Sequence, residues 1–164
     1  MDWTNLVSRT RWALSVCLLL SVPVAAHCAC LDFSGPVDVP RHPSIAQEYA
    51  STPWVFIGRA TASRDVPDPD DPEFYNWTIY DVQVVKVFKG KPPHHIRLLS
   101  ENTTARFPMD HGKEYLVFVS HSPTAEMAGK EKLPGDYVDN CGNSGPVEEA
   151  GATIRVVKGL SGAE

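Results

Sequence analysis

The sequence predicts a mainly β domain with flanking helices, and three observations lead to this prediction. Proline and glycine, 14 and 11 residues, make 25 of the 164 residues, a content typical of short strands joined by turns and unusual for a helical bundle. Four segments rich in aromatic and β-branched residues follow one another, each ended by turn-forming residues. The apolar residues of the tail instead recur with a helical period.

The N-terminus has the features of a secretory signal peptide. Arg9 and Arg11 precede an apolar run over residues 12–22, which Pro23 and small residues follow. This run is shorter than the roughly 20 residues that a helix needs to cross a bilayer, and no later segment is longer. We therefore expect no membrane span and a secreted or periplasmic protein, with an uncleaved signal anchor as the alternative.

Two cleavage sites compete, and the choice decides how many cysteines the mature protein keeps. Cleavage after Ala26 fits the preference for small residues best. Cleavage after Ala29 would also remove Cys28 and leave an even pair, Cys30 and Cys141. The predicted division is therefore a signal peptide ending at residue 29, with residue 26 as the alternative end, followed by one domain.

The domain spans residues 30–164 and is long enough to bury its own core. The chain carries 15 Lys and Arg against 20 Asp and Glu, a formal net charge of −5. It has no run of basic residues, so it lacks the positive surface that binding to phosphate backbones requires. We expect a monomer that binds no nucleic acid.

A short helix should open the domain, and strands should follow it. Residues 43–50 fit two helical turns, with Pro43 at the first position. The predicted strands are 54–62, 77–88, 95–100 and 114–120, with a fifth, short strand at 137–138. The pattern of alternating burial slips at Val84 and Val85, which predicts a bulge in the second strand.

One connection and the tail complete the predicted order. Residues 65–73 carry five carboxylates and three prolines, so we expect an exposed and mobile loop that buries nothing. In the tail, Ser144 can cap a helix of about three turns whose apolar face includes Val147 and Val157. The expected order is therefore a strand meander first and a helix last.

Four segments of the chain share an order and spacing with a known family: Cys28-Ala29-Cys30, residues 49–58 (YASTPWVFIG), residues 80–90 (YDVQVVKVFKG) and residues 112–118 (GKEYLVF). Together they resemble the netrin-like domain shared with tissue inhibitors of metalloproteinases. The resemblance implies an OB-like five-stranded barrel, to which the sequence adds a C-terminal helix. It also implies disulfides from the N-terminal cysteines to later ones and no enzymatic activity.

The resemblance also suggests a disulfide pairing. Domains of this kind usually carry a further cysteine between the third and fourth strands, and residues 104–109 contain none. One of the two expected disulfides is therefore absent, and we expect the remaining one to join Cys30 to Cys141. Such a bond closes a loop of about 110 residues and contributes about 3–5 kcal/mol. Cys28 would then be free or removed with the signal.

In the inhibitors of this family, the α-amine and carbonyl of the N-terminal cysteine chelate the catalytic zinc of the protease. The resemblance carries this role to Cys28, but only if Cys28 is the mature N-terminus, because an acylated nitrogen is no metal ligand. Ala29, Cys30 and Leu31 would complete the partner-binding segment. Family inhibitors favour Ser or Thr where this chain has Ala29, and such a departure weakens the case for inhibition.

Other residues predict no further site. His94 and His95 are adjacent at a strand entrance, and adjacent strand residues point to opposite faces, so we expect no shared metal. No nucleophile–base pattern and no phosphate-binding glycine motif is recognisable. We therefore expect no cofactor and no enzyme.

These observations predict a secreted, non-enzymatic domain that binds another protein. The resemblance makes a zinc metalloprotease the leading partner. The alternative is a structural or accessory module of the cell envelope without inhibitory activity.

Overall fold

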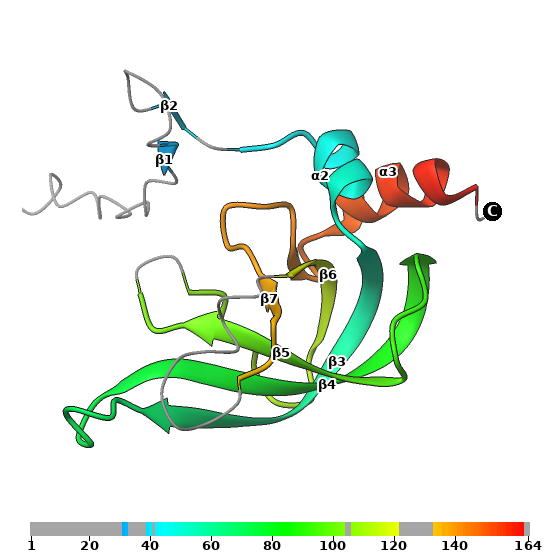
Figure 1. The fold of residues 1–164 in the computed structure, drawn as a ribbon. Coiled ribbons are helices and arrows are strands. Elements are labelled where there is room, and N and C mark those ends of the chain that lie inside the picture. The colour runs from blue at the N-terminus through cyan, green and yellow to red at the C-terminus, as the bar shows by residue number, and fades with distance from the viewer. Residues whose placement is uncertain (1–30, 33–38, 41, 104–105, 122–132, 163–164) are drawn as a thin grey trace, which may run out of the picture.

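The computed structural model describes residues 31–32, 39–40, 42–103, 106–121 and 133–162 (Figure 1). The predicted signal peptide, with Cys28, Ala29 and Cys30, lies outside these residues. The described elements are β1 (Leu31–Asp32), β2 (Val39–Pro40), α2 (Ile45–Ser51), β3 (Trp54–Pro67), β4 (Tyr75–Lys89), β5 (His95–Glu101), β6 (Glu114–His121), β7 (Asp136–Val138), β8 (Gly145–Pro146) and α3 (Gly151–Ser161).

Five strands form a closed barrel in the order β3-β4-β5-β7-β6, and the pairing of β3 with β6 closes it. The β5–β7 pair is parallel and the others are antiparallel, so the barrel is mixed. The short strand β8 pairs with the start of β6. The predicted fold class, an OB-like five-stranded barrel with flanking helices, is confirmed.

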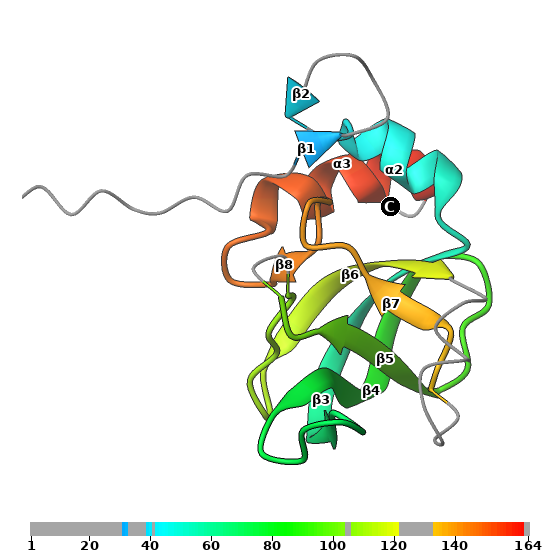
Figure 2. The same ribbon diagram turned by 60° about the vertical axis from the view of Figure 1, so that its left-hand side comes forward.

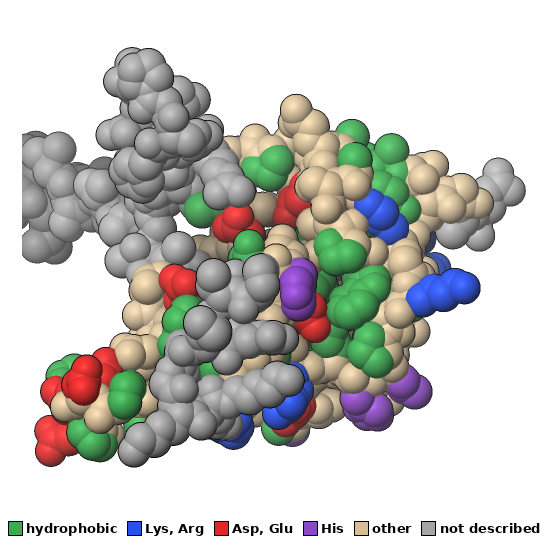
Figure 3. Space-filling view, viewed as in Figure 1, with side chains coloured by type: hydrophobic (Ala, Val, Ile, Leu, Met, Phe, Trp, Pro, Cys, Tyr) green, Lys and Arg blue, Asp and Glu red, His purple; other side chains and the backbone are tan. Residues whose placement is uncertain are grey.

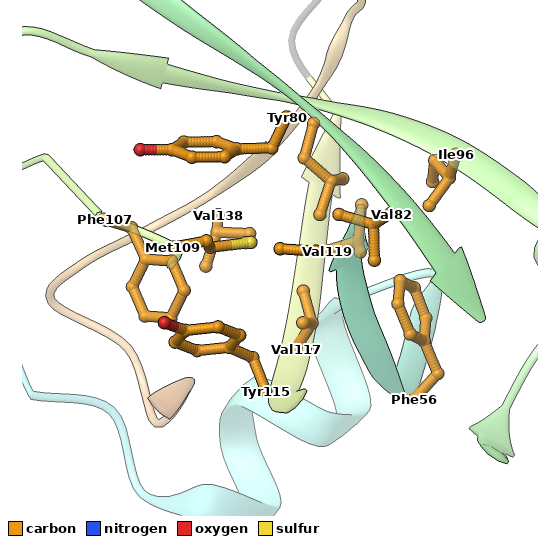
Figure 4. Close-up of a cluster of buried hydrophobic side chains, with 12 residues drawn as sticks. Phe56, Tyr80, Val82, Ile96, Phe107, Met109, Tyr115, Val117, Val119 and Val138 are labelled. Atoms are coloured by element: carbon orange, nitrogen blue, oxygen red, sulfur yellow. The ribbon is translucent and has the colours of Figure 1, made fainter. Parts of the chain in front are cut away.

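The inside of the barrel is filled by one cluster of apolar side chains (Figure 4). Every strand of the barrel contributes to it, and so does the loop before β6. The buried members are Phe56, Ala60, Tyr80, Val82, Ile96, Leu98, Phe107, Met109, Tyr115, Val117, Val119 and Val138. The alternation predicted for the second strand is confirmed, because Tyr80, Val82 and Val84 all face this cluster.

The predicted bulge in β4 is also confirmed. Ile57 pairs with Lys86 and Gly58 pairs with Val84, so Val85 has no partner on β3. Gly58 is required here, because a Cβ at this position would lie 2.5 Å from a methyl group of Val82.

The two helices lie together on one side of the barrel (Figure 2). They cover a second apolar cluster on the outer face of β3, β4 and β6. Its buried members are Val55, Phe88, Leu116, Phe118, Ala150 and Val157. This side of the barrel is therefore covered by α2 and α3, the first and the last of the described helices.

Both helices begin later than the sequence predicts. For α2 the N-cap is Ser44, whose side chain accepts a hydrogen bond from the Gln47 backbone while the Gln47 side chain accepts one from Ser44. Pro43 therefore precedes the helix, and the capping box fixes its start.

In the tail, Ser144 does not cap a helix. Its hydroxyl accepts a hydrogen bond from the backbone N–H of Phe118, 2.9 Å away on β6. The chain then pairs with β6 as β8, and α3 starts only at Gly151. The prediction of a helix starting near Ser144 is wrong because the sheet competes for the same residue.

The expected loop over residues 65–73 is shorter than predicted. β3 continues to Pro67 and β4 starts at Tyr75, so the strands extend into the acidic segment. Val66 is buried there, 8% exposed, against Ile79, Leu99 and Leu133. The segment does bury a residue, because the carboxylates face solvent while Val66 faces inward.

Candidate protein-binding surface

Of the predicted site residues, the structure describes Leu31 and Cys141. Leu31 begins β1 and pairs with Pro40 of β2. Cys141 is half-buried and disulfide-bonded. The pairing of Cys141 with Cys30 stays a prediction, because the other cysteines of the chain lie outside the described residues.

Cys141 lies in a loop, residues 139–144, that is anchored at both ends. Asp139 forms a turn in which its carboxylate accepts the Cys141 N–H at 2.9 Å and its carbonyl accepts the Gly142 N–H at 3.0 Å. At the other end, Ser144 binds the backbone of β6. The disulfide is therefore held on a fixed part of the barrel.

This loop contacts the first turn of α2 through a buried carboxylate. Glu48 is 7% exposed, and one of its oxygens, Oε2, accepts hydrogen bonds from the backbone N–H and the side-chain amide of Asn143, both at 2.6 Å. The same side-chain amide donates to the Pro43 carbonyl at 3.0 Å. A Cβ on Gly142 would lie 2.1 Å from Oε1 of Glu48, so any other residue here would force the Glu48 carboxylate to move.

Burial is the main cause that raises the pKa of Glu48, and Asp139 adds to the effect through charge repulsion. The two hydrogen bonds from Asn143 act in the opposite direction. The sequence analysis missed this group. A helical projection would have found it, because Ile45, Glu48 and Tyr49 share the face that packs on the barrel.

The C-terminal end of α2 is fixed by residues at the end of β4. The Lys89 ammonium donates to the carbonyls of Tyr49 and Ala50 and lies 5.2 Å from the centre of the Tyr49 ring. Gly90 has a φ of 74°, and a Cβ there would lie 2.4 Å from the Pro53 carbonyl oxygen. The Lys-Gly pair that contributes to the family resemblance therefore joins the helix to the barrel.

On the far side of the barrel, the β3–β4 hairpin extends past the barrel closure. β3 pairs with β6 only as far as Arg59, whereas its pairing with β4 continues to Pro67 and Tyr75. We call residues 62–81 the arm. The arm packs on β5, β7 and the residue Leu133 through a third apolar cluster, whose buried members are Val66, Ile79, Leu99 and Leu133, with Trp77 and Tyr137 packed against them.

The tip of the arm is organised by hydrogen bonds. The Asp68 carboxylate accepts the N–H groups of Asp70, at 2.7 Å, and Asp71, and the Asn76 side-chain amide at 2.7 Å. The Asp68 N–H donates to the Phe74 carbonyl, and the Phe74 N–H donates to the Asp71 carbonyl. Within this ordered turn the Phe74 side chain is 66% exposed.

The tip is strongly acidic. Residues 65–76 contain five carboxylates and no Lys, Arg or His, a formal charge of −5 that equals the net charge of the whole chain. Figure 3 shows these acidic side chains gathered with apolar ones at the end of the hairpin. The pKa of Asp68 is lowered by the hydrogen bonds it accepts, first that from Asp70.

The described histidines do not assemble a metal site with other described residues. His94 and His95 lie with their rings stacked, 4.9 Å between centroids, so the prediction that they point to opposite faces is wrong. The reason is that His94 precedes β5 and is free of its alternation. His121 hydrogen-bonds Asp136 at 3.1 Å. Among the described residues, no three metal-ligating side chains come together.

In the described part of the chain, no helix is long and apolar enough to span a bilayer. Comparison with protein-family models and with curated proteins gives no match.

Proposed function

We propose that this protein is a secreted, non-enzymatic domain that acts by binding another protein. The observation that carries this proposal is the exposed Phe74 on the hydrogen-bonded tip of the arm. Aromatic side chains are common anchors in protein interfaces, and an anchor held in place before binding loses little conformational entropy on association. The apolar cluster around Ile79 packs the arm against the barrel.

We propose a zinc metalloprotease as the partner, and this part rests on the netrin-like resemblance. Its support is twofold. The barrel is OB-like, and the Lys89–Gly90 pair, one of the more specific motifs of the resemblance, makes contacts that hold α2. Cys28, Ala29, Cys30 and Leu31 would form the segment that enters the protease, with the α-amine of Cys28 on its zinc.

The experiment is a titration of the secreted protein against a panel of zinc metalloproteases, after sequencing of its N-terminus. If the mature chain starts at Cys28, we expect inhibition at or below micromolar concentration. One alanine added before that residue should abolish it without changing the melting temperature, because the α-amine becomes an amide. Inhibition that survives this extension contradicts the chelation mechanism.

The arm is tested in the same assay with Phe74→Ser. We expect inhibition to weaken about tenfold or more, the usual effect of removing an interface anchor. Val156→Ser is the matched control, because Val156 is also an exposed apolar residue, 44% exposed, but lies on α3. Equal effects of the two substitutions would contradict a specific role for the arm.

The alternative is an accessory module of the cell envelope without inhibitory activity. Residues 104–109 carry no cysteine where the family usually has one, so a second disulfide that would stiffen the N-terminal segment is missing. An unrestrained segment must be ordered on binding, at a cost of about 1–2 kcal/mol per residue. If no zinc protease is inhibited at micromolar concentration, this alternative replaces the inhibitor proposal.

A further inference from the structure

Glu48 is a buried carboxylate that is stabilised without a cation. Among the described residues, no Lys, Arg or His nitrogen lies within 4.0 Å of its oxygens, and its polar contacts are the two N–H groups of Asn143. Burial of an ionised group with only amide partners is costly. An apolar residue at this helix position would avoid that cost, so the contact with Asn143 calls for a role beyond packing.

That contact joins the loop to two points of the N-terminal chain. The Asn143 side-chain amide donates to both Glu48 and the Pro43 carbonyl, and Pro43 immediately precedes the helix cap. Gly142 packs against the other carboxylate oxygen without space for a side chain. Asn143 and Gly142 therefore fix where the chain enters α2.

The same loop carries the disulfide. The other three cysteines of the sequence all precede Leu31, so a disulfide formed by Cys141 within the chain reaches back beyond β1. The N-terminal segment between that bond and α2 is then attached to residues 139–144 at both ends. One attachment is covalent, and the other is the Glu48–Asn143 contact.

We propose that Glu48 is the positioning residue of the N-terminal segment: its carboxylate holds Asn143 and so sets the place of the segment relative to the barrel. The consequence for partner binding rests on the proposed function. The positioning itself does not, because it concerns only contacts within the domain.

The charges around Glu48 determine how this contact responds to pH. Asp139, in the loop, acts on it through repulsion, and α3, which packs on α2, carries Arg155 and Lys158 without forming an ion pair with it. Because burial raises the pKa of Glu48 while the contact is closed, a proton favours the closed state over an opened, solvated one. The contact should therefore open more often as the pH rises.

The backbone N–H of Asn143 reports this opening directly, because it donates to Glu48. Hydrogen exchange of the intact domain, corrected for the intrinsic pH dependence, should show its protection falling as the pH rises from the ordinary pKa of Glu48 through its raised pKa. Glu48→Gln should remove this dependence, because the amide does not titrate. Glu48→Ala should lower protection about tenfold, the effect of losing a hydrogen bond to a charged group. Glu149→Gln, which changes an exposed glutamate before α3, should change neither.

The Ser44 N–H, which donates to the Gln47 side chain, should lose protection together with Asn143 in Glu48→Ala. Unchanged protection at both places, or the same pH dependence in Glu48→Gln, would overturn the proposal. If Glu48→Ala fails to fold, the pH dependence of Asn143 protection in Glu48→Gln tests the proposal by itself. In the protease assay, Glu48→Ala should weaken inhibition. If the unmodified protein inhibits nothing, the inhibitor proposal fails while the exchange result still judges the positioning role.

Discussion

The loop around Cys141 and the tip of the arm are two turns built by the same local chemistry and used in opposite ways. In each, one aspartate carboxylate accepts a backbone N–H two residues ahead: Asp139 from Cys141, and Asp68 from Asp70. The loop is packed between α2 and β6, whereas the tip projects into solvent. The local sequence forms the turn, but its surroundings decide whether it fixes a chain segment or displays a side chain.

The carboxylates of the two regions differ in the same way. Burial raises the pKa of Glu48 beside the loop, while accepted hydrogen bonds lower the pKa of the exposed Asp68 at the tip. The comparison can be tested by substitutions that act on one region and spare the other.

The largest loss of stability should come from a substitution in the apolar cluster that packs the arm against the barrel. Ile79 is 2% exposed, and Ile79→Ala should lower the free energy of unfolding by about 2–5 kcal/mol because it leaves a cavity. Urea unfolding measures this, with the exposed Val85→Ala as control. Exchange should increase at Asp70 and Asp71 but not at Asn143. A parallel increase at all three would show that the two regions open as one unit.

Gly142→Ala should cause the next largest loss in the free energy of unfolding. Its Cβ would lie 2.1 Å from Oε1 of Glu48, so the Asn143 hydrogen bonds must shift or break, at about 1–3 kcal/mol. Gly145→Ala is the control, because a Cβ there meets nothing within 4 Å. The cost of Gly142→Ala should shrink in a Glu48→Ala background. An undiminished cost would place the strain elsewhere in the loop.

The smallest expected effects are on the pH dependence of stability, and those of Glu48 and Asp68 have opposite signs. The contribution of Glu48 to stability is full below its ordinary pKa and is lost as the pH rises through its raised pKa. The contribution of Asp68 is present above its ordinary pKa and is lost as the pH falls through its lowered pKa. Thermal unfolding from acid to neutral pH should therefore change in opposite ways in Glu48→Gln and Asp68→Asn. A common change would refute the contrast.

The strands were predictable because their signal is local. Alternating residues such as Tyr80 and Val82 identify the inner face, and the slip at Val84 and Val85 identifies the bulge. The start of α3 was not predictable in this way. Ser144 has the residue type of a helix cap, but the Phe118 N–H, 26 positions earlier, binds its hydroxyl.

The candidate binding surface was predictable only in part. Phe74 falls between the acidic loop and the strand expected to start at Trp77, so no periodic pattern included it. A helical projection places Glu48 on the buried face of the predicted helix, but its partner Asn143 lies 95 positions later, where no local pattern identifies it. The roles of Cys28, Ala29, Cys30 and Leu31 in binding stay predictions from the resemblance.

The contact between Lys89 and α2 has a consequence for the order in which the domain acquires its structure. A helix of seven residues is not stable by itself in water, and the carbonyls at its end are held by a side chain that is synthesised 40 residues later. Its first turn waits still longer, for Asn143. The residues of α2 leave the ribosome early but are thus among the last to take up their final place.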